Sequence, residues 1–286
     1  MPPRSAPTAR QLRLGVELRK LRERAGLTAR QAGELLGGGQ ALASNIETGR
    51  FGLSEQRIRA LTANYGCTDE ALIAALVSMT GKRNPGWWEK YRNELPVGQL
   101  DLAEAEHHAT TLHMASTVHV LGLLQTVDYA RALIRGAIPP PTPPELEHRV
   151  SYRIKRQQVL YREHPVPFRG ILHEAALRMR FGGRETMAAQ LRHLVELARK
   201  EHITLRVIPF AAEVLPGSGQ TISYFTGPVR QLDTAQLDQS HGTLLLHEEA
   251  QLTRYRQILA VMESAALSPE DSSDFIARIA KEHEAK

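Results

Sequence analysis

Four side chains between positions 40 and 45 have the chemistry needed to read the edges of DNA base pairs: Gln40, Ala41, Ser44 and Asn45. The amide of a Gln or Asn can form two hydrogen bonds with an adenine, and an alanine methyl group can contact the methyl group of thymine. These contacts require that the four residues lie near the start of a helix that enters the major groove. The chemistry therefore depends on a short helix that begins near position 40.

The stretch 27–49, LTARQAGELLGGGQALASNIETG, predicts two short helices joined by a tight turn. Thr28 can cap the first helix, and Gly37 ends it because the turn needs a residue that tolerates positive φ. Gly33 leaves room for the two backbones to approach where the helices cross. The pattern resumes over 40–47, and a turn this tight is the geometry of a helix-turn-helix.

The residues around this helix pair resemble the Cro/repressor type (XRE-like) of helix-turn-helix domain. In that family a first helix carries leucines at helical spacing, and the recognition helix ends in I-E-x-G. Both features are matched here, by Leu14, Leu18, Leu21, Ile46, Glu47 and Gly49. The resemblance covers about sixty residues and implies binding to double-stranded DNA.

The sequence departs from the family pattern at three positions. Leu42 and Asn45 stand where such recognition helices usually carry Lys or Arg, and Gly39 stands where Ser or Thr usually caps the helix. The expected base contacts are therefore few and electrically neutral.

Positive charge is concentrated near the N-terminal end. The chain has 36 Lys and Arg against 31 Asp and Glu, and its first thirty residues hold eight basic and two acidic ones, so the rest is close to neutral. A basic end on a near-neutral body suits contact with DNA phosphates. Arg30 and Arg50 flank the helix pair and are the candidate phosphate contacts.

The length of 286 residues fits two or three packed units. We expect a helix-turn-helix DNA-binding domain at 8–80, a linker with the sequence GKRNPG at 81–86, and an effector and dimerisation domain at 87–286. In the last domain, 87–165 is expected to be helical and 166–286 to be α+β. The predicted fold class is thus mainly α with a C-terminal α+β part, in which a small mixed sheet has flanking helices.

Several segments of the effector domain give definite expectations. The stretch LDLAEAEHHATTLHMAS (100–116) predicts one helix. PFRGILHE, RETMAAQLRHLVELARKE and HITLRVIPF predict a strand–helix–strand unit with parallel strands. QTISYFTG and VRQLDTAQLD predict two further strands, joined by a hairpin at Gly227 and Pro228.

The effector domain has its own resemblance. WWEKYRNELP, LGLLQTVDYARALI, LHEAAL, ITLRVIPF and YRQILAVMESAALSPEDS are similar to motifs of the WhiJ-like, antitoxin-like transcription regulators of actinobacteria. This resemblance implies a DNA-binding regulator that often works beside a small partner protein encoded nearby. It carries over no ligand and no catalytic residue.

Two features could receive a partner or a ligand. Trp87, Trp88 and Tyr91 follow the linker, and aromatic residues of this kind dominate protein interfaces. The Gly-rich loop 210–220, FAAEVLPGSGQ, offers apolar groups beside a predicted strand. The alternative is that both stretches only complete the core. The basic helix at 149–162 has three interpretations, namely a second DNA contact, part of a dimer seam, or a solvated face.

No residue pattern predicts catalysis or a metal site. His173 and Glu174 begin a motif like the H-E-x-x-H of zinc proteases, but Leu177 stands in place of the second histidine. Glu104 and His108 stand four residues apart, yet no second cluster has ligand spacing. We therefore expect no enzyme activity, no cofactor and no metal.

Together these features predict a sequence-specific DNA-binding transcription regulator, homodimeric, with a C-terminal domain that receives a signal or a partner. The alternative is an antitoxin-like interaction module that sequesters a small partner protein and regulates its own promoter. The chain has one cysteine, Cys67, no apolar run of about 20 residues, and no signal-peptide stretch at its start. We expect a cytoplasmic, nucleoid-associated protein without a membrane partner.

Overall fold

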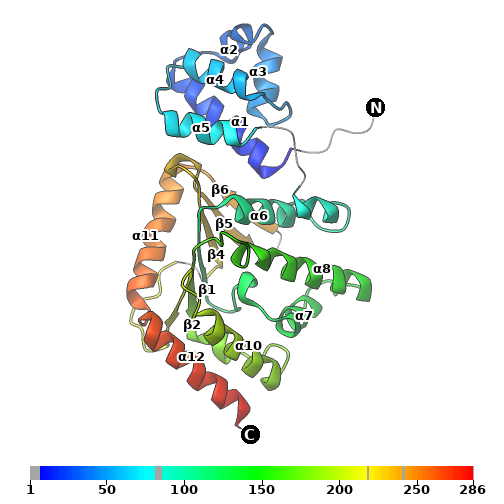
Figure 1. Ribbon diagram of the computed structural model, residues 1–286, viewed down its shortest axis with the longest axis vertical. Coiled ribbons are helices and arrows are strands. Elements are labelled where there is room, and N and C mark those ends of the chain that lie inside the picture. The colour runs from blue at the N-terminus through cyan, green and yellow to red at the C-terminus, as the bar shows by residue number, and fades with distance from the viewer. Residues whose placement is uncertain (1–6, 81–85, 218, 240–241, 286) are drawn as a thin grey trace.

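The computed structural model describes residues 7–80, 86–217, 219–239 and 242–285. Within them, an N-terminal domain of short helices sits on a larger domain built around a six-stranded sheet (Figure 1). The predicted fold class, mainly α with a C-terminal α+β part, is confirmed. Of the predicted linker 81–86, all but Gly86 lies outside the described residues.

The described part of the N-terminal domain consists of α1 (Ala9–Arg24), α2 (Ala29–Leu35), α3 (Gln40–Glu47), α4 (Glu55–Asn64) and α5 (Glu70–Ser78). Leu14, Leu18 and Leu21 lie on one side of α1 because they repeat at helical spacing, and all three are buried in the domain core. Ile58 and Leu61 of α4 pack into the same core. Burial of this apolar stripe holds the short helices together.

The turn between α2 and α3 forms as the sequence predicts. Thr28 caps α2, and its side chain and that of Gln31 bond reciprocally to the backbone. Gly37 has a φ of +73°, which a residue with a side chain rarely adopts. A Cβ atom at Gly33 would overlap the backbone carbonyl group of Gly39, so only glycine allows this helix crossing.

The sheet has the strand order β3-β2-β1-β4-β5-β6. Its strands are β1 (Thr111–Ser116), β2 (Phe168–His173), β3 (Ile203–Ile208), β4 (Ile222–Thr226), β5 (Thr234–Gln239) and β6 (Gly242–Leu246). Strands β1, β2 and β3 run parallel, and β4, β5 and β6 continue the sheet in antiparallel pairs. The predicted parallel unit of β2, helix and β3 is therefore confirmed.

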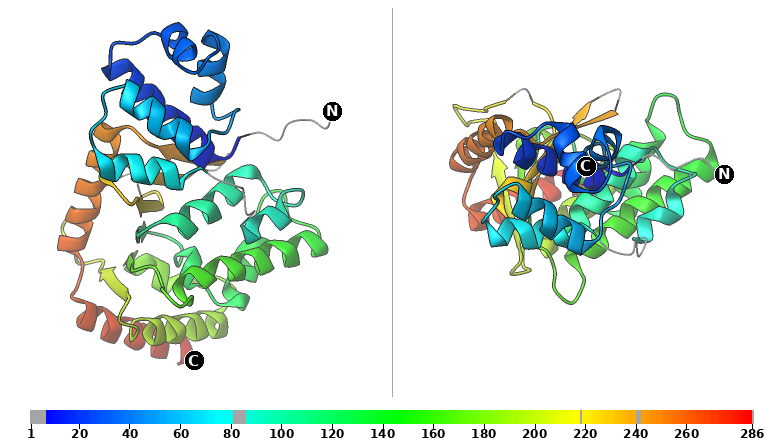
Figure 2. Two further views of the ribbon diagram at one scale, coloured as in Figure 1. Left: turned by 45° about the horizontal axis from the view of Figure 1, so that its top comes forward. Right: turned by 90° about the horizontal axis from the view of Figure 1, so that it is seen from above.

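The helical segments of the sheet domain are η1 (Trp87–Tyr91), α6 (Val97–His108), η2 (Gly122–Leu124), α7 (Val127–Arg135), α8 (Pro143–Arg156), η3 (Gln157–Leu160), α9 (Glu174–Arg178), α10 (Arg184–Leu197), η4 (Arg230–Leu232), α11 (Glu249–Ala265) and α12 (Pro269–Glu284). Alternate strand residues face opposite sides of the sheet. Phe168 and Leu172 of β2 join a core with α10 and α12, whereas Ile171 joins a second core with α11. Figures 1 and 2 show helices on both faces.

The predicted helix over 100–116 is wrong in its second half. Helix α6 ends at His108, and the residues from Thr111 to Ser116 form β1, between β2 and β4 in the sheet. Its Leu, Met and Ala residues favour a helix locally, but pairing with a strand on each side outweighs that preference. The segment 87–165 is therefore not wholly helical.

The predicted hairpin of β4 and β5 is confirmed, and the connection between these strands also contacts the N-terminal domain. It contains η4, and Leu232 and Val229 pack into the hydrophobic core of the N-terminal domain. The Gln231 amide donates a hydrogen bond to the Asp69 carboxylate at 3.1 Å. The two domains thus share one apolar cluster.

Candidate nucleic-acid interface

Helix α3 exposes the residues predicted to read bases. The side chains of Gln40, Ala41 and Ser44 are exposed and that of Asn45 is half-buried. Figures 1 and 2 show α2 and α3 at the end of the molecule remote from α12 and the chain's C-terminus. The predicted base-reading residues therefore share one accessible helix on a face that the sheet domain leaves open.

A close backbone approach at Gly15 and an ion pair hold α3 against α1. A Cβ atom at Gly15 of α1 would overlap the carbonyl group of Glu47, so the two helices are in backbone contact. The guanidinium group of Arg22 binds Glu47, with Nη2 3.1 Å from Oε2, and also donates to the carbonyl oxygen of Leu27 at 2.6 Å. The side-chain hydrogen bond with Glu47 raises the pKa of Arg22 although burial opposes it. The acidic residue of the I-E-x-G motif thus positions the recognition helix.

The candidate phosphate contacts precede and follow α3 along the chain. Arg30 is exposed, and its Nε is 3.0 Å from Oε1 of Glu34 one turn along α2. An exposed pair of this kind is worth at most about 1 kcal/mol, so Arg30 can exchange Glu34 for a phosphate. Arg50 is exposed just after α3. Their roles stay predictions, and the geometry is compatible with them.

Part of the N-terminal positive charge serves the protein's own structure. Arg13, 4% exposed, donates hydrogen bonds to the carbonyl oxygens of His247, at 3.2 Å, and of Gln231 in the sheet domain. Lys20 lies 3.4 Å from the carboxylate of Glu248 in the same domain. The guanidinium group of Arg22 forms an ion pair with Glu47. A charge count over the first thirty residues therefore overstates the charge available to DNA.

The aromatic residues after the linker belong to a small core. Trp88 is 4% exposed and packs with Leu95, Leu100, Ala103 and Tyr152. Trp87 and Tyr91 are half-buried at the edge of this cluster, each within 5.4 Å of the Tyr152 ring centroid. This packing favours the core interpretation for Trp88, while a partner role for Trp87 and Tyr91 stays a prediction.

The Gly-rich loop lies apart from this aromatic cluster. Phe210, Val214 and Leu215 are exposed, and Gly217 lines a hollow with Tyr255 of α11. One residue of the loop, Ser218, is outside the described residues. The two predicted receiver stretches therefore do not form one site.

The basic helix at 149–162 is not one continuous solvated or DNA-facing surface. Arg156 is buried and binds Glu106 of α6, with Nε 2.9 Å from Oε2. Arg153 donates to the side-chain oxygen of Gln125 at 2.7 Å. Arg149 is half-buried, whereas Arg162 is exposed. Two of the basic residues therefore face inward and hold neighbouring segments of the sheet domain.

The residues of the zinc-protease-like motif have structural partners. The Nδ1 atom of His173 accepts a hydrogen bond from the backbone of Ala175 and caps α9. Glu174 binds the guanidinium group of Arg178 at 2.6 Å and accepts from the backbone of Phe210 at 2.7 Å. In the described parts of the chain, no group of three or more His, Cys, Asp or Glu side chains is placed to hold a metal ion.

No helix among the described residues has the length and hydropathy to cross a lipid bilayer.

Comparison with known families matches the two domains separately. A family described as "Helix-turn-helix domain" matches residues 13–76, which include most of α1 and all of α2, α3 and α4. A family described as "Domain of unknown function (DUF5753)" matches residues 99–278. Neither the curated proteins nor the solved structures yield a match to the chain. The chain therefore belongs to the DUF5753 family and carries a helix-turn-helix domain ahead of that region.

Proposed function

We propose that the protein is a sequence-specific DNA-binding transcription regulator that acts as a homodimer. The observation that carries this proposal is the exposure of Gln40, Ala41 and Ser44 at the start of α3, a helix that lies at the end of the molecule remote from α12 (Figure 1). Gly15 and Gly33 let α3 pack closely on α1 and α2. A rigidly held helix with short polar side chains at its start is what major-groove reading requires.

The two classes of contact predict different losses of DNA affinity. Gln40→Ala and Asn45→Ala are each expected to cost about 1–3 kcal/mol on a preferred site, because each removes base-edge hydrogen bonds. Arg30→Gln and Arg50→Gln are expected to weaken binding to every sequence alike. Each should also reduce the slope of log affinity against log salt by about one, since a phosphate contact releases about one counterion. Fluorescence anisotropy with a duplex selected from a random pool measures both effects.

A matched control is Arg131→Gln, which removes an arginine paired with Glu147 on α7 and α8 of the sheet domain. It should leave affinity and salt slope unchanged. Equal losses on selected and random duplexes for Gln40→Ala and Asn45→Ala would show that these residues do not read bases. Failure of the full chain to bind any duplex at low salt would contradict the proposed function itself.

The homodimer is proposed because one helix of this size spans only a few base pairs and discriminates poorly alone. Two copies of α3 on half-sites about 34 Å apart would supply the missing specificity. We expect the contacts between copies to lie after residue 81. Light scattering of the full chain at micromolar concentration should give twice the mass of one chain, with or without DNA. A monomer under both conditions would contradict the dimer.

The sheet domain is proposed as a non-catalytic receiver of a signal or a partner. Its β4–β5 connection places Val229 and Leu232 in the core of the helix-turn-helix domain, and Arg13 of α1 bonds to backbone carbonyl groups of the sheet domain. A structural change in the sheet domain would therefore be transmitted directly to α1, against which α3 packs.

The second candidate function is an antitoxin-like module that sequesters a small partner protein. The observation that favours it is the absence of any Lys or Arg from the sequence QALASNIE of α3, which limits base contacts to neutral groups. The duplex measurement separates the two functions. A regulator selects one sequence from the random pool unaided, whereas the antitoxin-like module should bind DNA weakly and without selection in the absence of its partner.

A further inference from the structure

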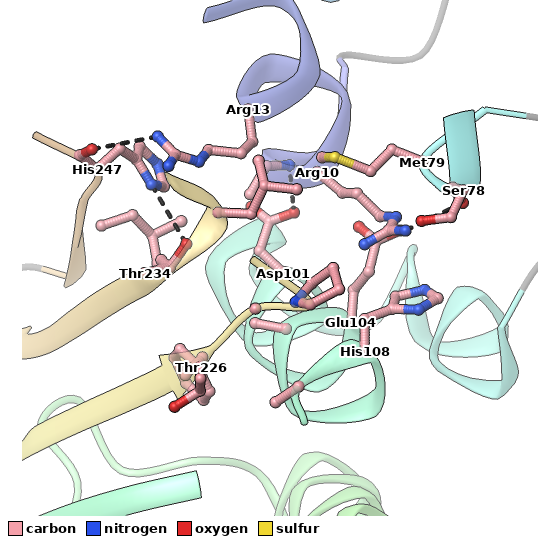
Figure 3. Close-up of a pocket in the computed structure, with 18 residues that line it drawn as sticks. Arg10, Arg13, Ser78, Met79, Asp101, Glu104, His108, Thr226, Thr234 and His247 are labelled. Atoms are coloured by element: carbon pink, nitrogen blue, oxygen red, sulfur yellow. Dashed lines mark hydrogen bonds between the residues drawn. The ribbon is translucent and has the colours of Figure 1, made fainter. Parts of the chain in front are cut away.

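A cavity of about 240 Å³ lies between the helix-turn-helix domain and the sheet domain. Its walls come from α1 and the end of α5 on one side, and from α6, the β4–β5 connection and β6 on the other (Figure 3). A space of this kind between two domains suits a small molecule.

The walls combine an apolar surface with charged groups. Met79, Pro228, Leu232 and Leu245 contribute apolar atoms from both domains. The charged groups are Arg10 and Arg13 from α1, and Asp101 and Glu104 from α6. Among the described residues, the other titratable groups that line the cavity are two histidines, His108 and His247. Pockets that bind small molecules usually combine apolar walls with a few convergent polar groups in this way, often between domains.

Burial disfavours the charged form of both guanidinium groups, although Arg13 is paired with Glu17, its Nη1 3.1 Å from Oε1. Arg10 donates a hydrogen bond to the carbonyl oxygen of Ser78 at 3.2 Å, and burial lowers its pKa although Glu104 attracts it. Burial also lowers the pKa of Arg13 in spite of nearby carboxylates. The Nε atom of Arg13 is buried without a hydrogen-bond partner. A further anion beside these groups would therefore be stabilised.

Positively charged side chains lie near both histidines of the cavity. Burial, followed by the positive charge of Arg10, lowers the pKa of His108 to about 4. Burial and the charges of Arg13 and Lys20 bring His247 to a similar value. Of the two acidic residues, Asp101 is engaged by the Ala9 backbone N–H at 2.9 Å. The surroundings thus favour a negative ligand over a positive one.

We infer that this cavity binds a small organic carboxylate and that the bound molecule changes DNA affinity. The carboxylate group lies at Arg10, and the apolar body lies against Met79, Leu232 and Leu245. Because the walls belong to both domains, the ligand bridges them and alters how the helix-turn-helix domain is docked. The effect on DNA rests on the proposed function, whereas the binding of the carboxylate does not.

The test uses the full chain and three single-ring probes of similar size: benzoate, neutral benzamide and cationic benzylamine. Isothermal titration at constant ionic strength should give saturable binding of benzoate, with a dissociation constant of about 1 mM, and weaker or undetectable binding of the other two. Arg10→Gln should weaken benzoate binding about tenfold or more, because it removes the charged donor. Arg24→Gln, at the other end of α1 and outside the cavity lining, should leave it unchanged. Ala105→Leu should also weaken binding, because the larger side chain occupies part of the cavity.

The second readout is duplex affinity of the wild-type chain in saturating benzoate, compared with equimolar chloride. We expect a change of about threefold or more, which Arg10→Gln abolishes. No saturable benzoate binding, tighter binding of benzylamine, or benzoate binding insensitive to Arg10→Gln would overturn the site. An unchanged duplex affinity with benzoate bound would overturn the coupling. If the chain binds no duplex but retains Arg10-dependent benzoate binding, the proposed function fails and the carboxylate site stands.

Discussion

Replacement of Trp88 by alanine is expected to lower the free energy of unfolding by about 3–5 kcal/mol, as for a large buried aromatic residue. Trp88 is 4% exposed and packs with Leu95, Leu100, Ala103 and Tyr152. Its removal leaves a cavity that the surrounding helices cannot fill. Denaturant unfolding of the full chain, followed by circular dichroism, measures the loss.

The matched control is Trp87→Ala, because Trp87 is the same residue type one position earlier and only half-buried. Its loss should be clearly smaller, since less apolar area returns to water. If Trp88→Ala left the unfolding transition unchanged, the core interpretation would be wrong and Trp88 would be available to a partner. The expected large loss of stability in Trp88→Ala would show that Trp88 holds η1 against α6 and α8.

Local signals were sufficient to predict the helix-turn-helix. The helix cap at Thr28, the positive φ at Gly37 and the close approach at Gly33 each depend on a few neighbouring residues, and all are found in the structure. The leucine spacing of α1 agrees with these signals. Agreement between capping, turn and apolar spacing makes a short sequence specify one structure.

Strands that depend on distant partners were harder to predict. Segment TLHMAS becomes β1 because β2 and β4, far along the chain, pair with it on both sides. Segment GTLLL, which forms β6 (Gly242–Leu246), was not predicted, since a run this short gives no clear periodicity. In both cases the strand forms by pairing with another strand, which the local residue pattern does not indicate.

The roles of the individual basic residues could not be predicted from the sequence either. Arg13 and Arg22 add to the N-terminal charge just as Arg30 does, yet they are buried in structural contacts while Arg30 is exposed. The insertion of Leu232 into the other domain likewise joins residues more than 150 positions apart along the chain. The cavity between the domains follows from that docking, so no motif could have indicated it.

The second large effect is expected at the buried pair of Glu106 and Arg156. Glu106 is 1% exposed and Arg156 is 8% exposed, and the pair joins α6 to α8 with Nε 2.9 Å from Oε2. Burial alone would lower the pKa of Arg156, but the charge of Glu106 raises it, so the guanidinium group stays charged. Glu106→Gln keeps the side-chain shape but leaves that charge without a counter-ion. A loss of about 3–5 kcal/mol in the free energy of unfolding is therefore expected.

Two further variants separate lost charge compensation from lost packing. Glu147→Gln breaks the exposed pair with Arg131 and should leave the free energy of unfolding nearly unchanged, because water compensates both charges there. The double variant Glu106→Gln with Arg156→Leu removes the uncompensated charge and should recover much of the stability lost in Glu106→Gln alone. If the double variant lost as much stability as Glu106→Gln and Arg156→Leu lose separately when added together, lost packing of the pair would be the cause. Recovery would show that Glu106 is needed because Arg156 is buried and charged.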